Sequence, residues 1–369
     1  MRQMPAYLRD YRELYEKNPR EANLTWFRQA GYGLFMHYGL YSILGSESRE
    51  DEKIMEWVQY NRKIPVSEYA KLKDRFTAEN FDADAIASFA KQCGMKYINL
   101  TTRHHDSFCL FETRHTDFNS LNSPAGRDLI RELADACERH ELALFLYYSH
   151  GRDWKHPHAP NNDAWGSAAR PQYDPPEPSY KVGEEHNLDE YVEFMKAQVR
   201  ELLTQYPTAA GIWLDGLGVL LSGDHESFKT EELYELIREL SPHALVSYKQ
   251  GLFGTEDYFA PEHKVPKKEN EAGEDYQKHT NRLGKIEEHK EKLVEVCTTM
   301  IKNPVSWGYK AKAVHLTEEE VWEKLTQARD NRYNLLLNIG VMGDGGLDPI
   351  DVEVLLRVGR RLAGSVSAT

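Results

Sequence analysis

The sequence has no long hydrophobic run and no excess of basic charge, and each absence argues against a class of partner. After the start at Met1, a polar run from Tyr7 to Lys17 leaves no apolar segment long enough for a signal peptide or a membrane span. We therefore expect a cytoplasmic protein without a membrane partner. Lys and Arg number 46 against 59 Asp and Glu, with no basic stripe to follow a phosphate backbone, so we expect no nucleic-acid partner.

Cysteine pairs and three common catalytic or nucleotide-binding motifs are also missing. The cysteines are widely spaced within apolar stretches and form no CxxC pair, which indicates buried free thiols; they are Cys93, Cys109, Cys137 and Cys297. There is no P-loop and no Gly-x-Gly-x-x-Gly after a predicted strand, which argues against nucleotide chemistry. The Gly-x-Ser-x-Gly elbow of serine hydrolases is absent as well, so Ser/His/Asp catalysis is not favoured.

What the chain does contain is a regular alternation of apolar strands and amphipathic helices. Its 369 residues, 40% of them hydrophobic, suffice for one large domain. Eight strands are predicted, the fourth ending at Asp215 and the others at residues 32–39, 96–102, 142–149, 244–248, 257–260, 294–301 and 333–340. Eight strand and helix units, allowing for one weak helix in the charged segment 264–292, predict an α/β (β/α)8 barrel. We expect residues 1–24 to form an N-terminal helical extension and residues 25–369 the catalytic barrel.

Polar and aromatic residues gather where the predicted strands end. The carboxyl ends of barrel strands carry the chemistry of this architecture, and Asp215 lies there between a buried strand and Gly216. An Asp before a glycine can also simply cap a turn, so its neighbours matter. The other candidates at predicted strand ends or in the loops after them are His37, Glu56, Trp57, His104, His105, Tyr147, Trp213, Glu262 and Trp307.

Two carboxylates, several histidines and several aromatic faces are typical of a sugar-binding cleft. A retaining glycosidase needs a nucleophilic carboxylate and a second carboxyl group about 5 to 5.5 Å away, roles that Asp215 and Glu262 can fill. Zinc ligation by the histidines is the first alternative. Adjacent strand residues point to opposite faces, so we expect His104 and His105 not to share one ion readily. Hydrogen bonding to a polyol suits them at least as well.

Several motifs together carry a resemblance to a known family. They are GLFMHYG (33–39), Glu56-Trp57, FTAENFD (76–82), LTTRHHD (100–106), YYS (147–149), IWLDG (212–216) and NLLLNIG (334–340). In this order they resemble the α-L-fucosidases of glycoside hydrolase family 29, over roughly residues 25–362. The resemblance implies an irregular (β/α)8 barrel, hydrolysis with retention of configuration, and no metal or other cofactor.

The resemblance also implies roles for individual residues. The nucleophile of the family falls on Asp215, and its acid/base, in Ala260-Pro261-Glu262, on Glu262, with Glu295 and Glu56 in reserve. The residues implied to bind fucose are His37, Glu56, Trp57, His104, His105, Tyr147, Trp213 and Trp307. The expected partner is a fucosylated oligosaccharide or glycoconjugate, and a homo-oligomer is compatible with the sequence.

The chain departs from the family pattern in five respects, one of which is Val294-Glu295 where the family has Trp-Glu before the seventh strand. Tyr38 stands where the family usually has Trp, and Ser107 follows Asp106 where many members have glycine. Lys249 replaces an arginine often found after the fifth strand and lacks its planar fork, so we leave it out of the predicted site. The C-terminal β-sandwich common in the family is not expected here. Two alternatives remain: a metal-dependent barrel hydrolase using His37, His104, His105 and Asp215, and a non-catalytic fucose-binding barrel.

Overall fold

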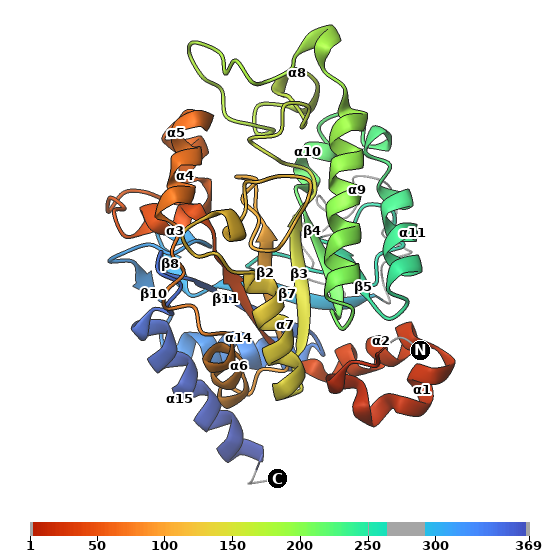
Figure 1. Cartoon of the computed structure of the whole chain (residues 1–369). Helices are drawn as coiled ribbons and strands as arrows, with labels where there is room; N and C mark the ends of the chain where they lie inside the picture. The colour runs from red at the N-terminus through yellow and green to blue at the C-terminus, as the bar shows by residue number, and fades with distance from the viewer. Residues whose placement is uncertain (1–2, 250, 264–291, 367–369) are drawn as a thin grey trace, which may run out of the picture.

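Eight parallel strands close into a barrel in the computed structural model, which describes residues 3–249, 251–263 and 292–366 (Figure 1). Around the barrel the strands follow the order β1-β11-β7-β6-β5-β4-β3-β2. Their bounds are β1 Tyr32–His37, β2 Tyr97–Arg103, β3 Ala143–Ser149, β4 Gly211–Asp215, β5 Leu245–Tyr248, β6 Tyr258–Phe259, β7 Leu293–Thr299 and β11 Asn334–Gly340. The predicted (β/α)8 barrel is therefore confirmed.

Helices cover the outside of the barrel and connect most of its strands (Figure 1). The α-helices are α3 Leu40–Gly45, α4 Val58–Asn61, α5 Val66–Ala70, α6 Ala83–Gln92, α7 Leu129–His140, α8 Asn162–Trp165, α9 Leu188–Gln205, α10 Leu217–Leu220, α11 Thr230–Leu240, α14 Glu318–Asp330 and α15 Pro349–Val366. Short 3₁₀ helices are η2 Met55–Trp57, η3 Lys71–Arg75, η4 Ser120–Asn122, η5 Gly183–Glu185 and η6 Glu226–Phe228. No helix in the described part of the chain combines the length and the apolar character that crossing a membrane requires.

The barrel is irregular between β5 and β7. The link from β5 to β6 contains no helix among its described residues, and β6 itself spans only Tyr258–Phe259. The charged segment predicted to be helical, residues 264–292, lies outside the described residues except for Lys292. The shortness of β6 agrees with its weak sequence signal, two apolar residues between turns.

Side chains along each strand alternate between two cores. On β1, Leu34 and Met36 pack into the layer shared with the outer helices, whereas Phe35 joins the aromatic interior of the barrel. This alternation is what a strand enclosed on both faces requires. Residues two apart in a strand share a face. His37, two residues after Phe35, therefore also points into the barrel interior, at the carboxyl end of the strand.

The N-terminal segment closes the amino-terminal end of the barrel. A 3₁₀ helix, η1 Ala6–Tyr11, leads into α1 Arg12–Lys17 and α2 Pro19–Ala30. From α2 the fully buried ring of Phe27 lies with its centroid 4.5 Å from that of Tyr258 and 5.7 Å from that of Tyr97. Helix α2 runs without interruption through residue 24, where we set the end of the extension, and the division into two domains stays a prediction.

The seventh strand ends earlier than the sequence suggested. We expected a strand over residues 294–301, but β7 ends at Thr299 and Ile301 already belongs to β8 Ile301–Asn303. This strand pairs antiparallel with β9 Val305–Ser306 and β10 Val314–His315 in a small separate sheet. An apolar run cannot reveal such a change of sheet, because both strands are buried where they meet. The small sheet delivers Trp307 to the mouth of the barrel.

Candidate active site

A cavity of about 450 Å³ opens at the carboxyl ends of the strands, and every predicted site residue lines it. The predicted residues found there are His37, Glu56, Trp57, His104, His105, Tyr147, Trp213, Asp215, Glu262 and Trp307. The fold brings these ten residues together from seven different parts of the chain. Residues that we did not predict also line the cavity: Phe35, Ile54, Arg152, Leu217, Gly218, Leu221, Lys249, His263 and Val305.

Asp215 is held at the end of β4 by its own backbone. Its carbonyl oxygen accepts hydrogen bonds from the amides of His150 at 3.0 Å and Gly151 at 2.9 Å. Gly216 follows with φ of +96°, and a Cβ there would lie 2.6 Å from the Cα of Gly151. Only glycine fits this turn, since an L side chain would both clash and strain the backbone. The Asp215-Gly216 pair thus fixes the direction of the Asp215 carboxylate.

The carboxylate of Asp215 is paired with donors on both oxygens. Tyr147 donates its hydroxyl to Oδ2 at 2.7 Å, and Lys249 Nζ lies 2.8 Å from Oδ1. Burial alone would raise the pKa of Asp215, but the positive charges of Lys249 and, to a smaller extent, Arg152 hold that pKa well below 3.8. Asp215 is therefore ionised throughout the neutral range, as a nucleophile must be.

Lys249 is the main correction to the predicted site. We left it out because it lacks the planar fork of arginine, yet its Nζ lies between the two candidate catalytic carboxylates, 2.8 Å from Asp215 and 2.7 Å from Glu262 Oε1. The side chain of Glu262 is 35% exposed, whereas that of Asp215 is 9% exposed. A single ammonium can serve both carboxylates because its three N–H donors need no common plane.

Three histidines in the cavity are buried and neutral. Burial lowers the pKa of His37 to about 4, and it lowers the pKa values of His104 and His105 well below 6.5. His37 Nδ1 lies 2.7 Å from Asn338 Oδ1. The amide nitrogen of Asn338 donates to Trp307 O and to Thr299, so its oxygen accepts from His37. The other ring nitrogen, Nε2, is left as an acceptor for a ligand hydroxyl.

His105 has the same arrangement. Its Nδ1 lies 2.6 Å from Ser149 Oγ, and that hydroxyl donates to the carbonyl of Arg152. His105 Nδ1 is therefore the donor, and Nε2 faces Asp215 Oδ2 at 3.7 Å as a second acceptor. His104 stacks on Tyr147 with ring planes 13° apart, and its Nδ1 has no partner within the described structure. The histidines thus offer acceptors to a ligand rich in hydroxyl groups.

The expectation that His104 and His105 point to opposite faces is wrong. Strand β2 ends at Arg103, so both residues lie in the turn after it, where strand alternation no longer applies. Their ring centroids are 4.1 Å apart, and with Asp215 they bring three ligand atoms within 4.8 Å of one another. The Lys249 ammonium on Asp215 nevertheless opposes a cation at this point, because like charges this close repel strongly in a buried site. The metal hydrolase alternative is therefore disfavoured by charge.

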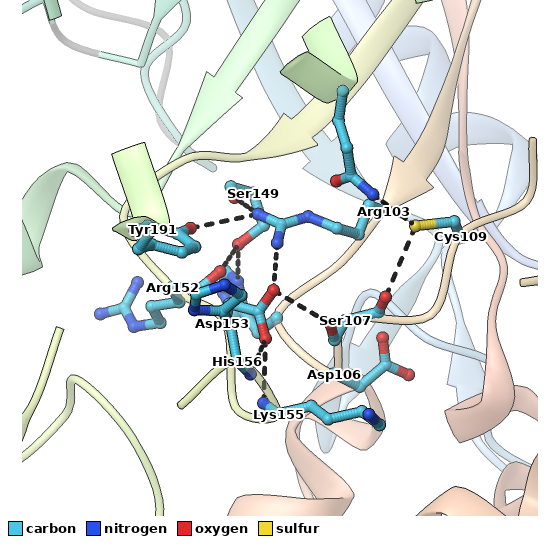
Figure 2. Close-up of polar contacts among 12 residues, drawn as sticks. Arg103, Asp106, Ser107, Cys109, Ser149, Arg152, Asp153, Lys155, His156 and Tyr191 are labelled. Carbon is cyan, nitrogen blue, oxygen red and sulfur yellow. Dashed lines mark hydrogen bonds and ion pairs between the residues drawn. The ribbon is translucent and has the colours of Figure 1, made fainter. Parts of the chain in front are cut away.

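A buried ion pair supports the turn that carries His105 (Figure 2). Arg103 pairs with Asp153, and both side chains are fully buried. Arg103 also donates to the carbonyl of Ser149, while Asp153 Oδ1 accepts the amides of Lys155 at 2.9 Å and His156 at 2.7 Å. The pair therefore ties the end of β2 to the loop after β3, and Ser149 connects it to His105.

Ser107, one of the departures from the family pattern, belongs to the same network (Figure 2). Its φ of +75° lies in the left-handed region, which glycine adopts more easily. The Ser107 hydroxyl donates to Asp153 Oδ2 at 2.9 Å, a contact that glycine could not make. This charge-assisted hydrogen bond offsets the backbone cost of a side chain at this position.

Aromatic faces line the cavity beside the carboxylates. Trp213 stacks on Tyr147 with centroids 5.6 Å apart and planes at 22°. Trp307 lies 5.4 Å from His37, centroid to centroid. Arg152 places its guanidinium 4.9 Å from the ring centroid of Trp57, a cation–π contact at the start of the long loop after β3. These faces suit the apolar side of a sugar ring.

The reserve carboxylates Glu56 and Glu295 lie in different places. Glu56 lines the cavity, where its Oε2 accepts the amides of Trp307 at 3.0 Å and Gly308 at 2.9 Å, and burial raises its pKa to about 7. Glu295 bonds Tyr97 and Trp213 inside the barrel, is absent from the cavity lining, and has its pKa raised to about 7 by burial. Of the two, only Glu56 can reach a ligand in the cavity.

The lining residues that we did not predict differ in how much the sequence indicated their position. Lys249 directly follows β5, so its position at a strand end was a usable signal. Arg152 lies in the long loop after β3, where sequence position says nothing about which side chain turns inward. His263 follows Glu262 and packs against Trp307 at a tilt of 38°, with the ring centroids 5.3 Å apart. The only indication in the sequence that His263 belongs to the site was its position next to Glu262.

The chain is similar to known proteins over nearly its whole length. A family model described as alpha-L-fucosidase matches residues 3–364. The plasma alpha-L-fucosidase of Rattus norvegicus is 28% identical over 95% of this chain and 71% of its own. Among solved structures, alpha-L-fucosidase isoenzyme 1 from Paenibacillus thiaminolyticus is 32% identical with a TM-score of 0.75, covering 94% of this chain and 76% of its own. Unliganded AlfC from Lactobacillus casei, an alpha-L-fucosidase, is 28% identical with a TM-score of 0.77, covering 94% and 99%.

Proposed function

The chain belongs to the alpha-L-fucosidase family of glycoside hydrolases, and on that premise we propose that it is an exo-acting, retaining enzyme that removes terminal α-L-fucosyl groups from glycans. In this proposal Asp215 is the nucleophile, Glu262 is the acid/base, and the reaction passes through a covalent fucosyl-aspartate. The other predicted residues bind the sugar. Their common position in one cavity supports these roles.

The observation that carries the stereochemical proposal is the bridge made by Lys249. Since Nζ lies 2.8 Å from Asp215 Oδ1 and 2.7 Å from Glu262 Oε1, these two oxygen atoms are at most about 5.5 Å apart, the sum of the two contacts. Retaining glycosidases place their carboxyl groups about 5 to 5.5 Å apart, whereas inverting enzymes need roughly 6.5 to 9.5 Å for an intervening water. The short separation favours a double displacement.

Each step then uses groups already in position. In the first step an Asp215 oxygen attacks the anomeric carbon while Glu262, as the acid, gives its proton to the glycosidic oxygen, and the C–O bond to the leaving group breaks. In the second step Glu262 takes a proton from water, which attacks the same carbon and releases Asp215. Tyr147 and Lys249 hold the carboxylate of Asp215, so little reorganisation is needed when its charge changes.

The substrate proposal is a fucosylated oligosaccharide or glycoconjugate. Neutral His37 and His105 each leave Nε2 as an acceptor, which matches the hydroxyl groups of the sugar. The aromatic faces match its apolar side and its methyl group. Among the similar structures, AlfC from Lactobacillus casei has been solved with the product α-L-fucose and, as a mutant, with Fuca(1,6)GlcNAc.

The test compares wild type with single carboxylate variants on 4-nitrophenyl α-L-fucoside and on a fucoside with a sugar leaving group. Asp215→Ala should remove nearly all turnover of both while the thermal unfolding curve stays cooperative. Glu262→Ala should lose far more activity on the sugar leaving group, which needs protonation, than on nitrophenolate, which does not. If Glu262→Ala matches wild type on both and Glu56→Ala shows the selective loss, the acid role passes to Glu56.

A matched measurement separates the remaining alternatives. Dialysis against a chelator should leave the rate of wild type unchanged. A loss of activity that returns with stoichiometric zinc would instead support the metal hydrolase. Binding of fucose without turnover of any fucoside would support the non-catalytic barrel.

A further inference from the structure

Two exposed apolar side chains stand together at the edge of the catalytic cavity. Within the part of the chain that the structure describes, the exposed large hydrophobic residues are Ile54, Val182, Val305, Val314 and Ile350. Of these, Ile54 and Val305 line the cavity, and each is 40% exposed. The amide of Ile54 donates to the carbonyl of Val305 at 3.0 Å, so the two are neighbours. Single exposed apolar residues are ordinary, whereas these two are adjacent and border the cavity that a ligand would enter.

The backbone of Ile54 adds an independent sign of function. It adopts φ of +55° and ψ of +64°, a left-handed conformation that is rare and costly for a β-branched residue. Hydrogen bonds on both sides hold it there: the Val305 carbonyl accepts from Ile54, and the Trp57 amide donates to the Ile54 carbonyl at 2.8 Å. Backbone strain of this kind is concentrated at sites that bind ligands.

More apolar surface lies on the other side of the cavity. Leu217 and Leu221 line it from the α10 segment that follows β4. In the closed strand order, β4 lies opposite β11, and β11 separates the two strands, β1 and β7, whose loops carry Ile54 and Val305. The two apolar pairs therefore come from opposite sides of the barrel and line the same cavity.

We propose that Ile54 and Val305, with Leu217 and Leu221 opposite, form a leaving-group subsite that takes an apolar alkyl or aryl aglycone. The proposal rests on the function assigned above. Glu262 is more exposed than Asp215, so the acid lies toward the opening and the leaving group that it protonates extends outward. A leaving group that extends in that direction contacts the four apolar residues, whereas the polar histidines bind the fucosyl ring deeper in the cavity.

The experiment compares octyl, methyl and fluoride leaving groups on α-L-fucose. Octyl and methyl fucosides both release an alkoxide, but only the octyl chain is long enough to cover the apolar residues of the proposed subsite. Fucosyl fluoride has no aglycone that could contact them. We expect wild type to show a kcat/KM roughly tenfold higher for the octyl than for the methyl fucoside, which is the low end of what one methylene contributes in an enclosed apolar pocket. A double variant, Ile54→Asn with Val305→Thr, should bring this ratio close to one and leave the fluoride rate unchanged.

The substitutions are chosen to limit other effects. Asn tolerates the left-handed backbone of Ile54, and Thr matches Val in shape. Val314→Thr is the matched control, because Val314 is 49% exposed in the same small sheet but does not line the cavity. It should keep the wild-type octyl-to-methyl ratio.

Three outcomes would overturn the proposal. The first is a wild-type ratio near one, the second is a double variant that keeps the wild-type ratio, and the third is an equal loss on all three substrates. Failure of the underlying function looks different, since wild type would then not turn over fucosyl fluoride at all.

Discussion

Lys249 acts on two carboxylates at once, and its effect on Asp215 can be measured. Burial raises the pKa of Asp215 and the Lys249 charge lowers it. In Lys249→Met the burial effect remains and the pKa of Asp215 rises. Because Asp215 must be ionised to act as the proposed nucleophile, the acid limb of the kcat/KM profile should move to higher pH, by about one unit or more. Profiles of wild type and Lys249→Arg, which keeps the charge, provide the comparison. An unmoved acid limb in Lys249→Met would contradict this role.

The buried carboxyl group of Glu295 should make the free energy of unfolding depend on pH. Burial raises its pKa from 4.5 to about 7, so the native state holds a proton that the unfolded state loses between these values. Wild type should therefore lose stability relative to Glu295→Gln as the pH rises from about 4.5 to above 7, by about 3 kcal/mol in total. Urea unfolding of both proteins at pH 4.5, 6 and 8 measures the difference. A difference that is constant with pH would show that Glu295 does not titrate in this range.

At the residue scale, the sequence predicted which residues line the site better than it predicted the hydrogen bonds and ion pairs between them. Asp215 and Glu262 were placed by strand ends and motif resemblance, and both line the cavity. Lys249 was discarded because a lysine cannot copy the fork of an arginine, although a bridge between two carboxylates needs only one charge. Which side chains turn inward from a long loop, as Arg152 does, depends on tertiary contacts that no local pattern encodes.

At the element scale, the loop after β3 depends on the buried pair of Arg103 and Asp153 (Figure 2). Removing one partner leaves an uncompensated buried charge, so Arg103→Met should lose about 3–5 kcal/mol of unfolding free energy. Arg103→Met combined with Asp153→Leu should recover part of that loss. Chemical unfolding measures stability, and KM for 4-nitrophenyl α-L-fucoside reports whether His105 keeps its place. A double variant less stable than the single one would contradict the account.

The elements themselves were predicted well where a strand stayed in one sheet. Strands β1 to β5 end within two residues of their expected positions. The error at β7 and β8 arose because no glycine, proline or other turn residue separates the barrel strand from the small sheet, which the chain enters at Met300. The second error, the opposite faces expected for His104 and His105, came from extending strand geometry two residues past Arg103.

At the scale of the whole molecule, aromatic packing closes the barrel at one end, and the cavity opens at the other. Phe27 is fully buried among Tyr97, Phe145 and Tyr258 at the closed end. Phe27→Ala should cost about 3–5 kcal/mol of stability and leave the kcat of the folded enzyme unchanged. Val182→Ala, at a 54% exposed position, is the control and should change neither. A large fall in kcat for folded Phe27→Ala would mean that the two ends are coupled.

The architecture could be predicted because eight apolar strands at regular spacing have few other solutions. The closing role of the N-terminal helices could not be predicted, since Phe27 belongs to a polar-looking segment whose partners lie on three distant strands. Long-range packing of this kind leaves no periodic trace in the sequence.

The measurement that tests the central claim most directly is the identity of the covalent intermediate. A 2-fluoro α-L-fucosyl fluoride slows the second step more than the first, so the fucosyl-enzyme should accumulate. Mass spectrometry of the intact protein should show one added fluorofucosyl group, and a proteolytic digest should place it on the peptide containing Asp215. A label on Glu262 or Glu56 instead, or no label on an enzyme that still turns over the compound, would contradict the assignment of Asp215 as the nucleophile.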